Sequence, residues 1–214
     1  MGILTLGGYM TCRKTTHDIY RDGRWLQRTW IDREYIWTES GVMWNGIKRR
    51  TNNTFTKKHG NNSYIGATNR FKSFNSFVEW ARLQIGYGMK YDLDSDILKL
   101  NCSAKVYSEE TCLLIPSSLN RFIQGSKISE IGLRGVCFDN NKQKYLAQCY
   151  FENDIDKSSN KVSKYFDNLS DAKIFYAEAK TNCAKIWLER LTSGEYIVDN
   201  RVIEYIRGWK FKYD

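Results

Sequence analysis

LDSDIL at residues 93–98 and VYSEETCLLIPSSLN at residues 106–120 are the two segments that decide how this chain folds. The first carries two alternating carboxylates, Asp94 and Asp96, in what the sequence predicts to be a hairpin. The second predicts a turn and then a helix containing Asn120. Carboxylate and amide oxygens suit Mg²⁺ or Mn²⁺, so we expect these three residues to hold one divalent cation, as in a ββα-metal nuclease. The alternative is that Asp94 and Asp96 are solvated acids flanking a hairpin.

The same two segments resemble the degenerate HNH segment of phage homing-endonuclease-like proteins. That segment runs L-D-K-D-I-L, a Gly-Asn turn, Y-S-P-E-T-C, then V-P and I-N. The matching residues are Leu93, Asp94, Asp96, Ile97, Leu98, Tyr107, Ser108, Glu110, Thr111, Cys112, Pro116 and Asn120. The resemblance implies an HNH-like ββα-metal domain, which we place at residues 35–126. It also implies a bacteriophage DNA-binding endonuclease, a metal-dependent hydrolase of duplex DNA.

Three departures from the family pattern bear on catalysis. Glu109 replaces the family's proline, and residues 101–103 replace its Gly-Asn turn. Ser95 stands where a typical HNH enzyme carries its general-base histidine, which leaves the base open between His17 and His59, with His59 in the basic KKHGNN segment. The competing hypothesis is a nuclease descendant that does not cut, acting as a DNA-binding module or as an inhibitor of a host nucleic-acid enzyme.

The composition is that of a globular protein with one or two domains, at 214 residues of which 42% are apolar. No run approaches the roughly 18 apolar residues of a membrane span, and residues 1–14 lack the order of a signal peptide. We therefore expect a cytoplasmic protein, in the host cell if it is of phage origin, with no membrane partner. The six cysteines form no CxxC motif, which predicts reduced, mainly buried thiols.

A net charge of +9 predicts attraction to a polyanion, with duplex DNA as the leading candidate. Residues 40–78 contain no Asp or Glu, and aromatic and amide side chains lie between their basic residues. Such a pattern is typical of a nucleic-acid interface, although a solvated basic face would look the same. The DNA-binding candidates in this segment are Lys48, Arg49, Arg50, Lys57 and Lys58.

Local patterns predict the elements of the first half. Residues 1–34 indicate an irregular arm or a short hairpin, and residues 37–50 a helix that ends in three basic residues. Residues 51–60 are polar and predict a loop. Ser76 and Glu79 form a possible capping box for a helix through Gln84.

The second half predicts three antiparallel strands and one amphipathic helix. The strands are expected at residues 133–138, 144–151 and 162–166, and Ser170 can cap the helix. This order resembles the Apetala-type DNA-binding domain of plant ethylene-response factors, which is also found appended to phage HNH proteins. The matching residues are Arg134-Gly135-Val136, Lys144-Tyr145-Leu146-Ala147, Tyr165-Phe166 and Asp171-Ala172, with Cys137 and Lys164 as departures. We place this domain at residues 131–192, so the expected fold class is α+β.

In the Apetala-type family the exposed face of the sheet lies in the major groove, which implies direct contacts with base edges. Strand parity places Lys144, Leu146, Gln148 and Tyr150 on one face and the more apolar set on the other. The candidate DNA contacts are Arg134, Lys142, Lys144, Gln148 and Tyr150, with Lys161 and Lys164 as flanking phosphate ligands. A solvated sheet face is the alternative. Residues 193–214 form a tail that we expect to fold back on a core or pair with another subunit.

Overall fold

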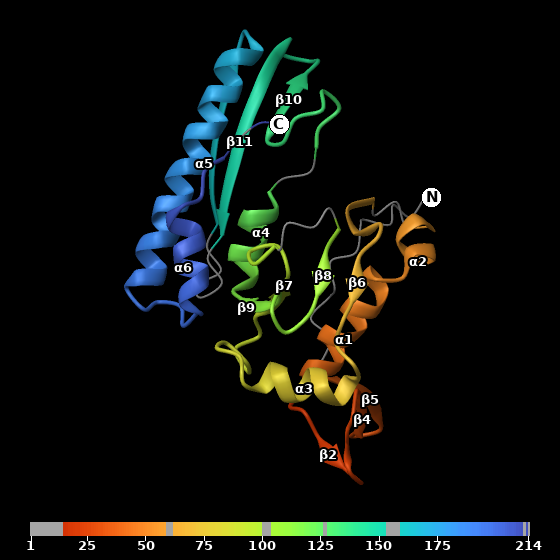
Figure 1. The fold of residues 1–214 in the computed structure, drawn as a ribbon. Helices are drawn as coiled ribbons and strands as arrows, with labels where there is room; N and C mark the ends of the chain where they lie inside the picture. Colours follow the sequence, from red (N-terminus) through yellow and green to blue (C-terminus); the bar gives the residue numbers. More distant parts are fainter. Residues whose placement is uncertain are drawn as a thin grey trace. The chain divides into compact units, whose positions relative to one another are not determined.

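The computed structural model describes residues 15–58, 62–99, 104–125, 128–152, 159–211 and 213. The fold is mixed α+β, as predicted, with helices and several small sheets (Figure 1). It divides into two compact units, Met1–Gln84 with Leu98–Cys112, and Ile85–Ile97 with Leu113–Asp214. Within the described ranges, no helix is both long and apolar enough to cross a membrane.

In its described residues the first unit contains short strands and three α-helices. Its elements are β1 (Thr15–Thr16), β2 (Tyr20–Arg21), β3 (Arg24–Trp25), β4 (Arg28–Ile31), β5 (Glu34–Thr38), α1 (Glu39–Arg50), α2 (Asn53–Lys58), the 3-10 helix η1 (Asn62–Tyr64), β6 (Thr68–Asn69), α3 (Phe74–Arg82) and β8 (Val106–Tyr107). Strands β4 and β5 form an antiparallel hairpin, and β1 pairs in parallel with the other side of β5. The short hairpin expected within residues 1–34 is present as β2 and β3, which pair antiparallel with Tyr20 opposite Trp25.

Helix α1 begins two residues after the predicted position. Trp37 belongs to β5, where it pairs with Arg28, and Thr38 is the N-cap of the helix. The Thr38 hydroxyl accepts a hydrogen bond from the amide of Gly41 at 3.1 Å, which satisfies one of the unpaired amides of the first turn. The basic end of the helix is as expected, with Lys48, Arg49 and Arg50 in the last turn.

Two local predictions in this unit were wrong for the same reason, a misplaced cap. Residues 51–60 are not all loop, because α2 begins at Asn53 and the Asn52 side chain accepts from the amide of Phe55 at 3.0 Å. Helix α3 is capped by Ser73 and not by Ser76. The Ser73 hydroxyl accepts from the Ser76 amide at 3.1 Å, and the Ser76 hydroxyl accepts from the Ser73 amide at 3.0 Å, so a pair of serines forms the capping box.

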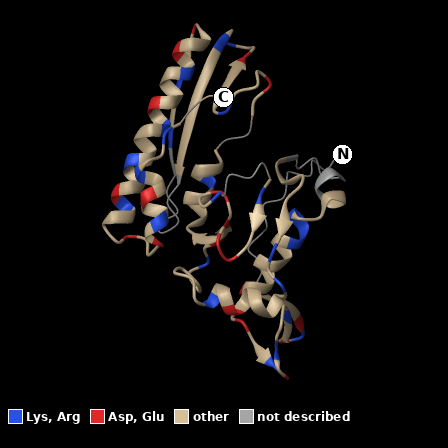
Figure 2. Cartoon of the chain, in the orientation of Figure 1, with Lys and Arg blue, Asp and Glu red and all other residues tan. Residues whose placement is uncertain are grey.

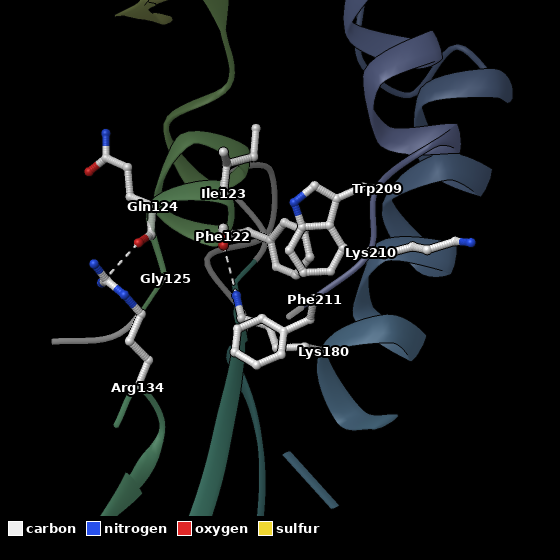
Figure 3. Close-up of a pocket in the computed structure, with 9 residues that line it drawn as sticks. All are labelled: Phe122, Ile123, Gln124, Gly125, Arg134, Lys180, Trp209, Lys210 and Phe211. Carbon is white, nitrogen blue, oxygen red and sulfur yellow. Dashed lines mark hydrogen bonds between the residues drawn. The ribbon is translucent and has the colours of Figure 1, made fainter. Parts of the chain in front are cut away.

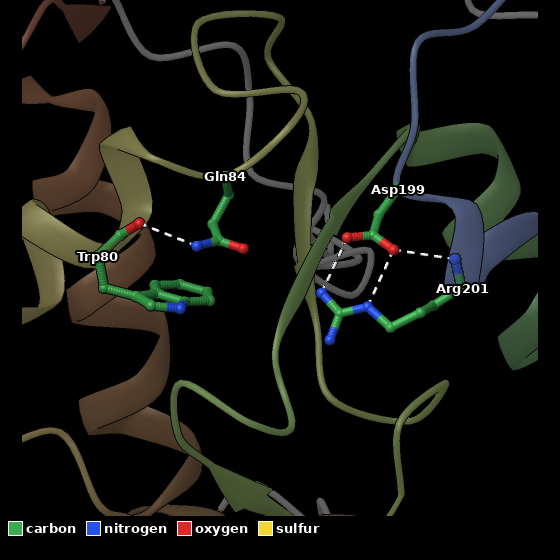
Figure 4. Close-up of polar contacts among 4 residues, drawn as sticks. All are labelled: Trp80, Gln84, Asp199 and Arg201. Carbon is green, nitrogen blue, oxygen red and sulfur yellow. Dashed lines mark hydrogen bonds and ion pairs between the residues drawn. The ribbon is translucent and has the colours of Figure 1, made fainter.

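An aromatic cluster forms the core of the first unit. Phe77 is fully buried and its ring lies 5.5 Å from Trp44 and 5.1 Å from Phe71. Trp80 joins the same cluster at 5.1 Å from Phe71. Large rings bury much apolar surface, so this cluster fixes α3 against α1. Helix α3 ends with the Gln84 side chain donating to the Trp80 carbonyl at 3.0 Å (Figure 4).

The part of the second unit that the structure describes contains an antiparallel strand pair, a three-stranded sheet and three helices. Its elements are β7 (Asp92–Asp94), β9 (Leu113–Ile115), α4 (Ser117–Gln124), β10 (Val136–Asp139), β11 (Lys144–Glu152), β12 (Ser159–Phe166), α5 (Leu169–Thr192) and α6 (Asn200–Arg207). Strands β10, β11 and β12 form an antiparallel sheet in that order. The order of three strands and one long helix matches the expectation, with β10 starting three residues later and the cap of α5 at Asn168 instead of Ser170.

Helix α5 covers one face of this sheet (Figure 1). The Phe151 ring lies 5.5 Å from Trp187, and the Phe166 ring lies 5.3 Å from Phe175. Cys149 of β11 and Cys183 of α5 are both buried, with their sulfurs 3.7 Å apart. Among the described cysteines Cys112, Cys149 and Cys183 are buried and Cys137 is half-buried, all as free thiols, which confirms that part of the prediction.

The C-terminal tail adds helix α6 beside α5. Val202 and Ile206 of α6 are buried, so the tail folds back on its own unit. Asp199 caps α6 by accepting from the amide of Arg201 at 2.8 Å, and it also binds the Arg201 guanidinium (Figure 4). The Arg201 hydrogen bond is the main cause that lowers the pKa of the Asp199 carboxyl. This arrangement favours a tail that folds back on a core over one that pairs with another subunit.

The two units divide the chain differently from the predicted boundaries at residues 34/35, 126/131 and 192/193. Segment 85–97 and segment 113–125 belong with the three-stranded sheet and the tail, because β7 pairs with β9, and α4 contacts β11. Residues 98–112 belong with the first unit, where β8 pairs with β6.

Gly135 provides a sharp test of the packing of α5 on the sheet. Its φ is +70°, and a Cβ at this position would overlap the ring of Tyr176. We predict that Gly135→Ala lowers the free energy of unfolding by about 2–5 kcal/mol, the sum of a strained backbone and an overpacked core. Urea unfolding followed by circular dichroism measures this change.

Gly132→Ala is the matched control, because Gly132 has a φ of +76° with open space around its Cβ position. We expect it to cost only the backbone strain, about 1–2 kcal/mol. Equal losses for the two variants would contradict the close contact between Gly135 and the Tyr176 ring.

Candidate cation site and nucleic-acid interface

The predicted strand and helix of the cation site are present in the second unit. Strands β7 and β9 pair antiparallel, with Asp92 opposite Ile115 and Asp94 opposite Leu113. Pro116 ends β9 and α4 follows at once. The backbone order is therefore strand, strand, helix, and the two strands are connected through residues 95–112 instead of a tight hairpin.

Asp94 is buried, with 3% of its surface exposed. Its Oδ1 accepts hydrogen bonds from the backbone amides of Asp96 and Ile97, both at 2.9 Å. The carboxylate therefore caps the turn that follows β7. Asp96 lies in that turn, beyond the end of the strand, so Asp94 and Asp96 are not two acids on one strand face as the sequence suggested.

Asn120 contacts an acid that sequence reasoning missed. It is 5% exposed, and its Nδ2 donates to Oδ2 of Asp92 at 3.1 Å. Its Oδ1 accepts from the side chain of Gln124 at 2.7 Å. Asp92 and Asp94 are two residues apart on β7, so their side chains leave the same face of the strand. The alternation in Asp92-Leu93-Asp94 was the signal that could have identified Asp92.

The oxygen donors that the structure gathers are thus those of Asp92, Asp94 and Asn120. Tyr205 of α6 lies close enough to feel the charges of these acids. Burial is the main cause that raises the pKa of its phenol, and the charges of Asp94 and Asp96 raise it further. In the part of the chain that the structure describes, no group of three or more His, Cys, Asp or Glu side chains is placed to hold a metal ion. A site here would depend on the amide of Asn120 as its third ligand.

The remaining motif residues build a turn in the first unit. The Thr111 hydroxyl donates to the Val106 carbonyl at 2.6 Å and accepts from the Ser108 amide at 3.1 Å. Ser108 also binds the carboxyl of Glu110, which is the main cause that lowers the Glu110 pKa. Ser108, Thr111 and Cys112 are buried, so this part of the motif has a structural role.

Neither candidate for the general base is placed by the structure at the carboxylates. His17 is exposed after β1 in the first unit, and His59 lies outside the described residues. Ser95, at the position of the family's histidine, is buried directly after Asp94. The structure therefore assigns no imidazole to the candidate cation site.

The face of the three-stranded sheet opposite α5 carries three of the predicted DNA contacts, Gln148, Tyr150 and Lys161. Gln148 and Tyr150 lie on this face, as strand parity predicted, since Ala147 and Cys149 are buried beneath α5. Across on β12, Ser163 is opposite Gln148 and Lys161 is opposite Tyr150. The Tyr150 hydroxyl donates to Gln148 at 3.4 Å, and the Lys161 ammonium lies 5.5 Å from the Tyr150 ring. Amide, hydroxyl and ammonium groups are therefore presented together.

The lysines near the β10–β11 turn have partners within the protein. Lys144 forms an ion pair with Asp167 at 3.0 Å, and Lys142 lies 4.0 Å from the ring of Tyr165. Tyr165 donates to Asp139 at 3.0 Å. Lys164 is on the other face, opposite Ala147, where it is exposed 5.4 Å from the Phe166 ring. The sheet thus separates Lys161, on the polar face, from Lys164 at the margin of the face that α5 covers.

Arg134 is not on a strand of the sheet but beside a pocket of about 380 Å³ at the end of α4 (Figure 3). Its guanidinium donates to the Gln124 carbonyl at 3.3 Å. Lys180 of α5 donates to the Phe122 carbonyl at 2.7 Å, and the rings of Phe122, Trp209 and Phe211 line the same pocket. Both cations therefore bind the unsatisfied carbonyls at the C-terminus of a helix.

The predicted basic segment of the first unit forms contacts between cations and aromatic rings. Arg49 lies 4.7 Å from the ring of Phe55, and Arg50 lies 5.6 Å from Tyr64. Lys48 donates to the side chain of Gln27 at 3.2 Å. In Figure 2 the ribbon of α1 is blue where its basic residues lie, in the last turn of the helix. Lys57 and Lys58 lie in α2, but their side chains lie outside the described part of the chain.

No match to this chain was found among protein-family models, curated proteins or solved structures. Its function therefore has to be inferred from the chemistry of its own residues.

The capping role of Asp94 can be measured apart from any metal. We predict that Asp94→Ala lowers the free energy of unfolding by about 1–2 kcal/mol, because two buried amides lose their acceptor. Asp94→Asn is the matched variant, since its amide oxygen can accept the same bonds, and it should lose much less. The two variants are compared by urea unfolding in EDTA. Equal losses in both would mean that the negative charge, and not the acceptor, stabilises the turn.

Proposed function

We propose that this protein binds duplex DNA through the face of the sheet formed by β10, β11 and β12 that is opposite α5. The observation that carries this proposal is the grouping of Gln148, Tyr150 and Lys161 on the sheet face opposite α5. A β-sheet face can enter the major groove, where amide groups pair with base edges and lysines contact phosphates. The resemblance to the Apetala-type domain supports the same assignment.

The segment containing β7, β9 and α4 is the proposed cleavage centre, a degenerate HNH-like ββα-metal domain. Two carboxylates on one strand face and an amide on the following helix are a hard oxygen donor set that fits Mg²⁺ or Mn²⁺. Asp92, Asp94 and Asn120 would hold the ion. When bound, a divalent cation stabilises negative charge on a phosphodiester in the transition state. Asp92 orients the Asn120 amide through their hydrogen bond.

The second candidate function is DNA binding without cleavage, with a host nucleic-acid enzyme as a possible target. Two observations favour it. Ser95 replaces the family's imidazole, and Asp94 already serves two backbone amides. A carboxylate retained for capping needs no catalytic role, so the cleavage assay below decides between the two candidates.

If the sheet reads the DNA sequence, the loss of a base contact and the loss of a phosphate contact should change DNA affinity in different ways. Gln148→Ala should weaken binding to a preferred duplex, selected from a random library, by about 1–3 kcal/mol and leave random duplex nearly unchanged. Lys161→Ala should weaken both and reduce the slope of log K against log salt by about one. Fluorescence anisotropy at several salt concentrations measures both quantities.

Lys185→Ala is the control for charge alone, because Lys185 is exposed on α5, away from the sheet face. It should change neither specificity nor the salt slope appreciably. A binding constant that hardly varies with salt would refute nucleic-acid binding. Equal effects of Gln148→Ala on both duplexes would refute sequence reading by this face.

Cleavage is tested with supercoiled plasmid in Mg²⁺ or Mn²⁺. We expect the wild type to nick and Asp94→Asn, which keeps the turn, to abolish nicking while duplex affinity stays within a few-fold. Ser95→His should raise the rate by about 100-fold, the typical gain from a positioned general base.

The second candidate function predicts another pattern. In that case neither protein nicks the plasmid, and calorimetry shows no ion binding that Asp94→Asn removes. Duplex binding through the sheet would then remain as the function.

A further inference from the structure

The hairpin of β4 and β5 in the first unit presents an exposed row of aromatic rings. Arg28 pairs with Trp37 and Trp30 pairs with Tyr35 across the two strands, so all four side chains lie on the same face. We call these four residues the aromatic ladder. Trp30 is 70% exposed and Tyr35 is 55% exposed, which is unusual for such large side chains.

The ladder is a continuous stack. The Trp30 and Tyr35 rings have centroids 5.4 Å apart and are tilted by 32°. The Arg28 guanidinium lies 5.4 Å from the Tyr35 ring and 3.5 Å from the Trp37 ring. The guanidinium thus lies between the outer pair of rings and Trp37, and it is the only charged group among the four residues.

The hairpin is held rigidly from its other face. Thr29 and Thr38 on that face are buried. The Thr38 hydroxyl donates to the Leu26 carbonyl at 2.8 Å, and a Cβ at Gly41 of α1 would collide with the Gln27 carbonyl. The residues just before β4 therefore contact the first turn of α1. This contact holds the ladder in a fixed position in the absence of a ligand.

The internal contacts do not account for the exposure of the outer rings. A cross-strand aromatic pair stabilises a hairpin, yet the pairing of Trp30 with Tyr35 leaves most of the indole in water. A ligand that covers the ladder must present flat apolar surfaces to the rings and tolerate the positive charge of Arg28. Glu34, the acid nearest in sequence, pairs with Ile31 on the other face.

Unpaired nucleobases meet these requirements. Every base has two π-faces, and a base in a duplex hides them by stacking on its neighbours. The rings of Trp30 and Tyr35 belong to one cross-strand pair, and their centroids are 5.4 Å apart. Stacked bases of duplex DNA are only about 3.4 Å apart, so rings at this spacing suit bases that are not stacked on one another.

Basic residues follow the ladder in the same unit. Lys48 binds the side chain of Gln27, the residue before Arg28, and it belongs to the basic last turn of α1. Alternation of stacking rings with cations is how proteins bind single strands without reading their sequence.

We propose that the aromatic ladder binds single-stranded nucleic acid by stacking unpaired bases on Trp30 and Tyr35. The positive charge of residues 40–78, which follow the ladder and contain no acid, favours a polyanion such as a nucleic acid over an uncharged or basic partner. This binding is independent of the proposed sheet interface for duplex DNA and of the candidate cation site.

The test uses the full chain and a fluorescently labelled oligothymidylate of 12 nucleotides in anisotropy titrations. Trp30→Ala and Tyr35→Ala should each weaken binding by about five-fold or more, the loss of one stacked base. Trp30→Phe should retain most of the affinity, because the benzyl ring still offers a face. Tyr20→Ala is the matched control, since Tyr20 is also exposed and pairs across a hairpin with Trp25.

A second probe separates stacking from charge. An oligomer of the same length made of abasic nucleotides has the same phosphates without bases. It should bind more weakly than oligothymidylate to the wild type and equally to the wild type and Trp30→Ala. Circular dichroism confirms that each variant remains folded.

The outcomes distinguish this proposal from the one above. Loss of oligothymidylate binding in Trp30→Ala with unchanged duplex affinity supports the ladder. If Trp30→Ala and Tyr35→Ala bind oligothymidylate like the wild type, the proposal is wrong, whatever the sheet variants do. Equal losses in Tyr20→Ala would also overturn it, because the effect would then not belong to the ladder.

Discussion

A buried lysine connects the two parts of the second unit. Lys180 of α5 is 4% exposed, donates to the Phe122 carbonyl at the end of α4 and lies 3.9 Å from the Phe122 ring. Burial lowers its pKa, and its hydrogen-bond acceptor is a backbone carbonyl instead of a carboxylate. An uncompensated buried cation is costly, so this bond and ring contact must persist whenever the unit is folded. They tie the helix of the candidate cation site to the helix that covers the sheet.

This connection explains why the sequence predicted the elements better than their grouping. The strands β11 and β12 and the helix α5 have strong periodic patterns, and a pattern of that kind is local. The association of α4 with α5 depends on Lys180 reaching a residue 58 positions earlier in the chain. A lone lysine in an amphipathic helix is ordinarily expected in solvent, so no local rule would have placed it in the interior.

The candidate site shows the same limit at the scale of single residues. Asp94 and Asn120 could be identified because a motif contains them, but the partner of Asn120 is Asp92, which precedes the motif. Likewise, α2 was missed because its start depends on one Asn52 side chain accepting from the Phe55 amide. Short helices with few apolar residues owe their existence to such caps, and composition alone describes them as loops.

The two proposed nucleic-acid surfaces differ in chemistry in a way that assigns them different ligands. The sheet face offers an amide, a hydroxyl and an ammonium, groups that pair with edges and phosphates and that can act on a stacked duplex. The ladder offers aromatic ring faces. The bases of a duplex are already stacked on their neighbours, so they cannot stack on these rings. One chain with both surfaces is suited to DNA that is duplex in one place and unpaired in another.

Asp94 has two roles that make different demands on its carboxylate, capping the turn after β7 and binding the proposed cation. Its Oδ1 closes the turn after β7 through two amides, so an ion bound by this residue must either use Oδ2 or displace bonds that stabilise the fold. A carboxylate can serve both purposes, since its two oxygens offer about four lone-pair directions. Holding the group by two amides also fixes its orientation, which is what a metal ligand requires from its surroundings. The cap therefore accounts for Asp94 without a metal, and the fixed orientation it gives the carboxylate is also what a cation at this site would need.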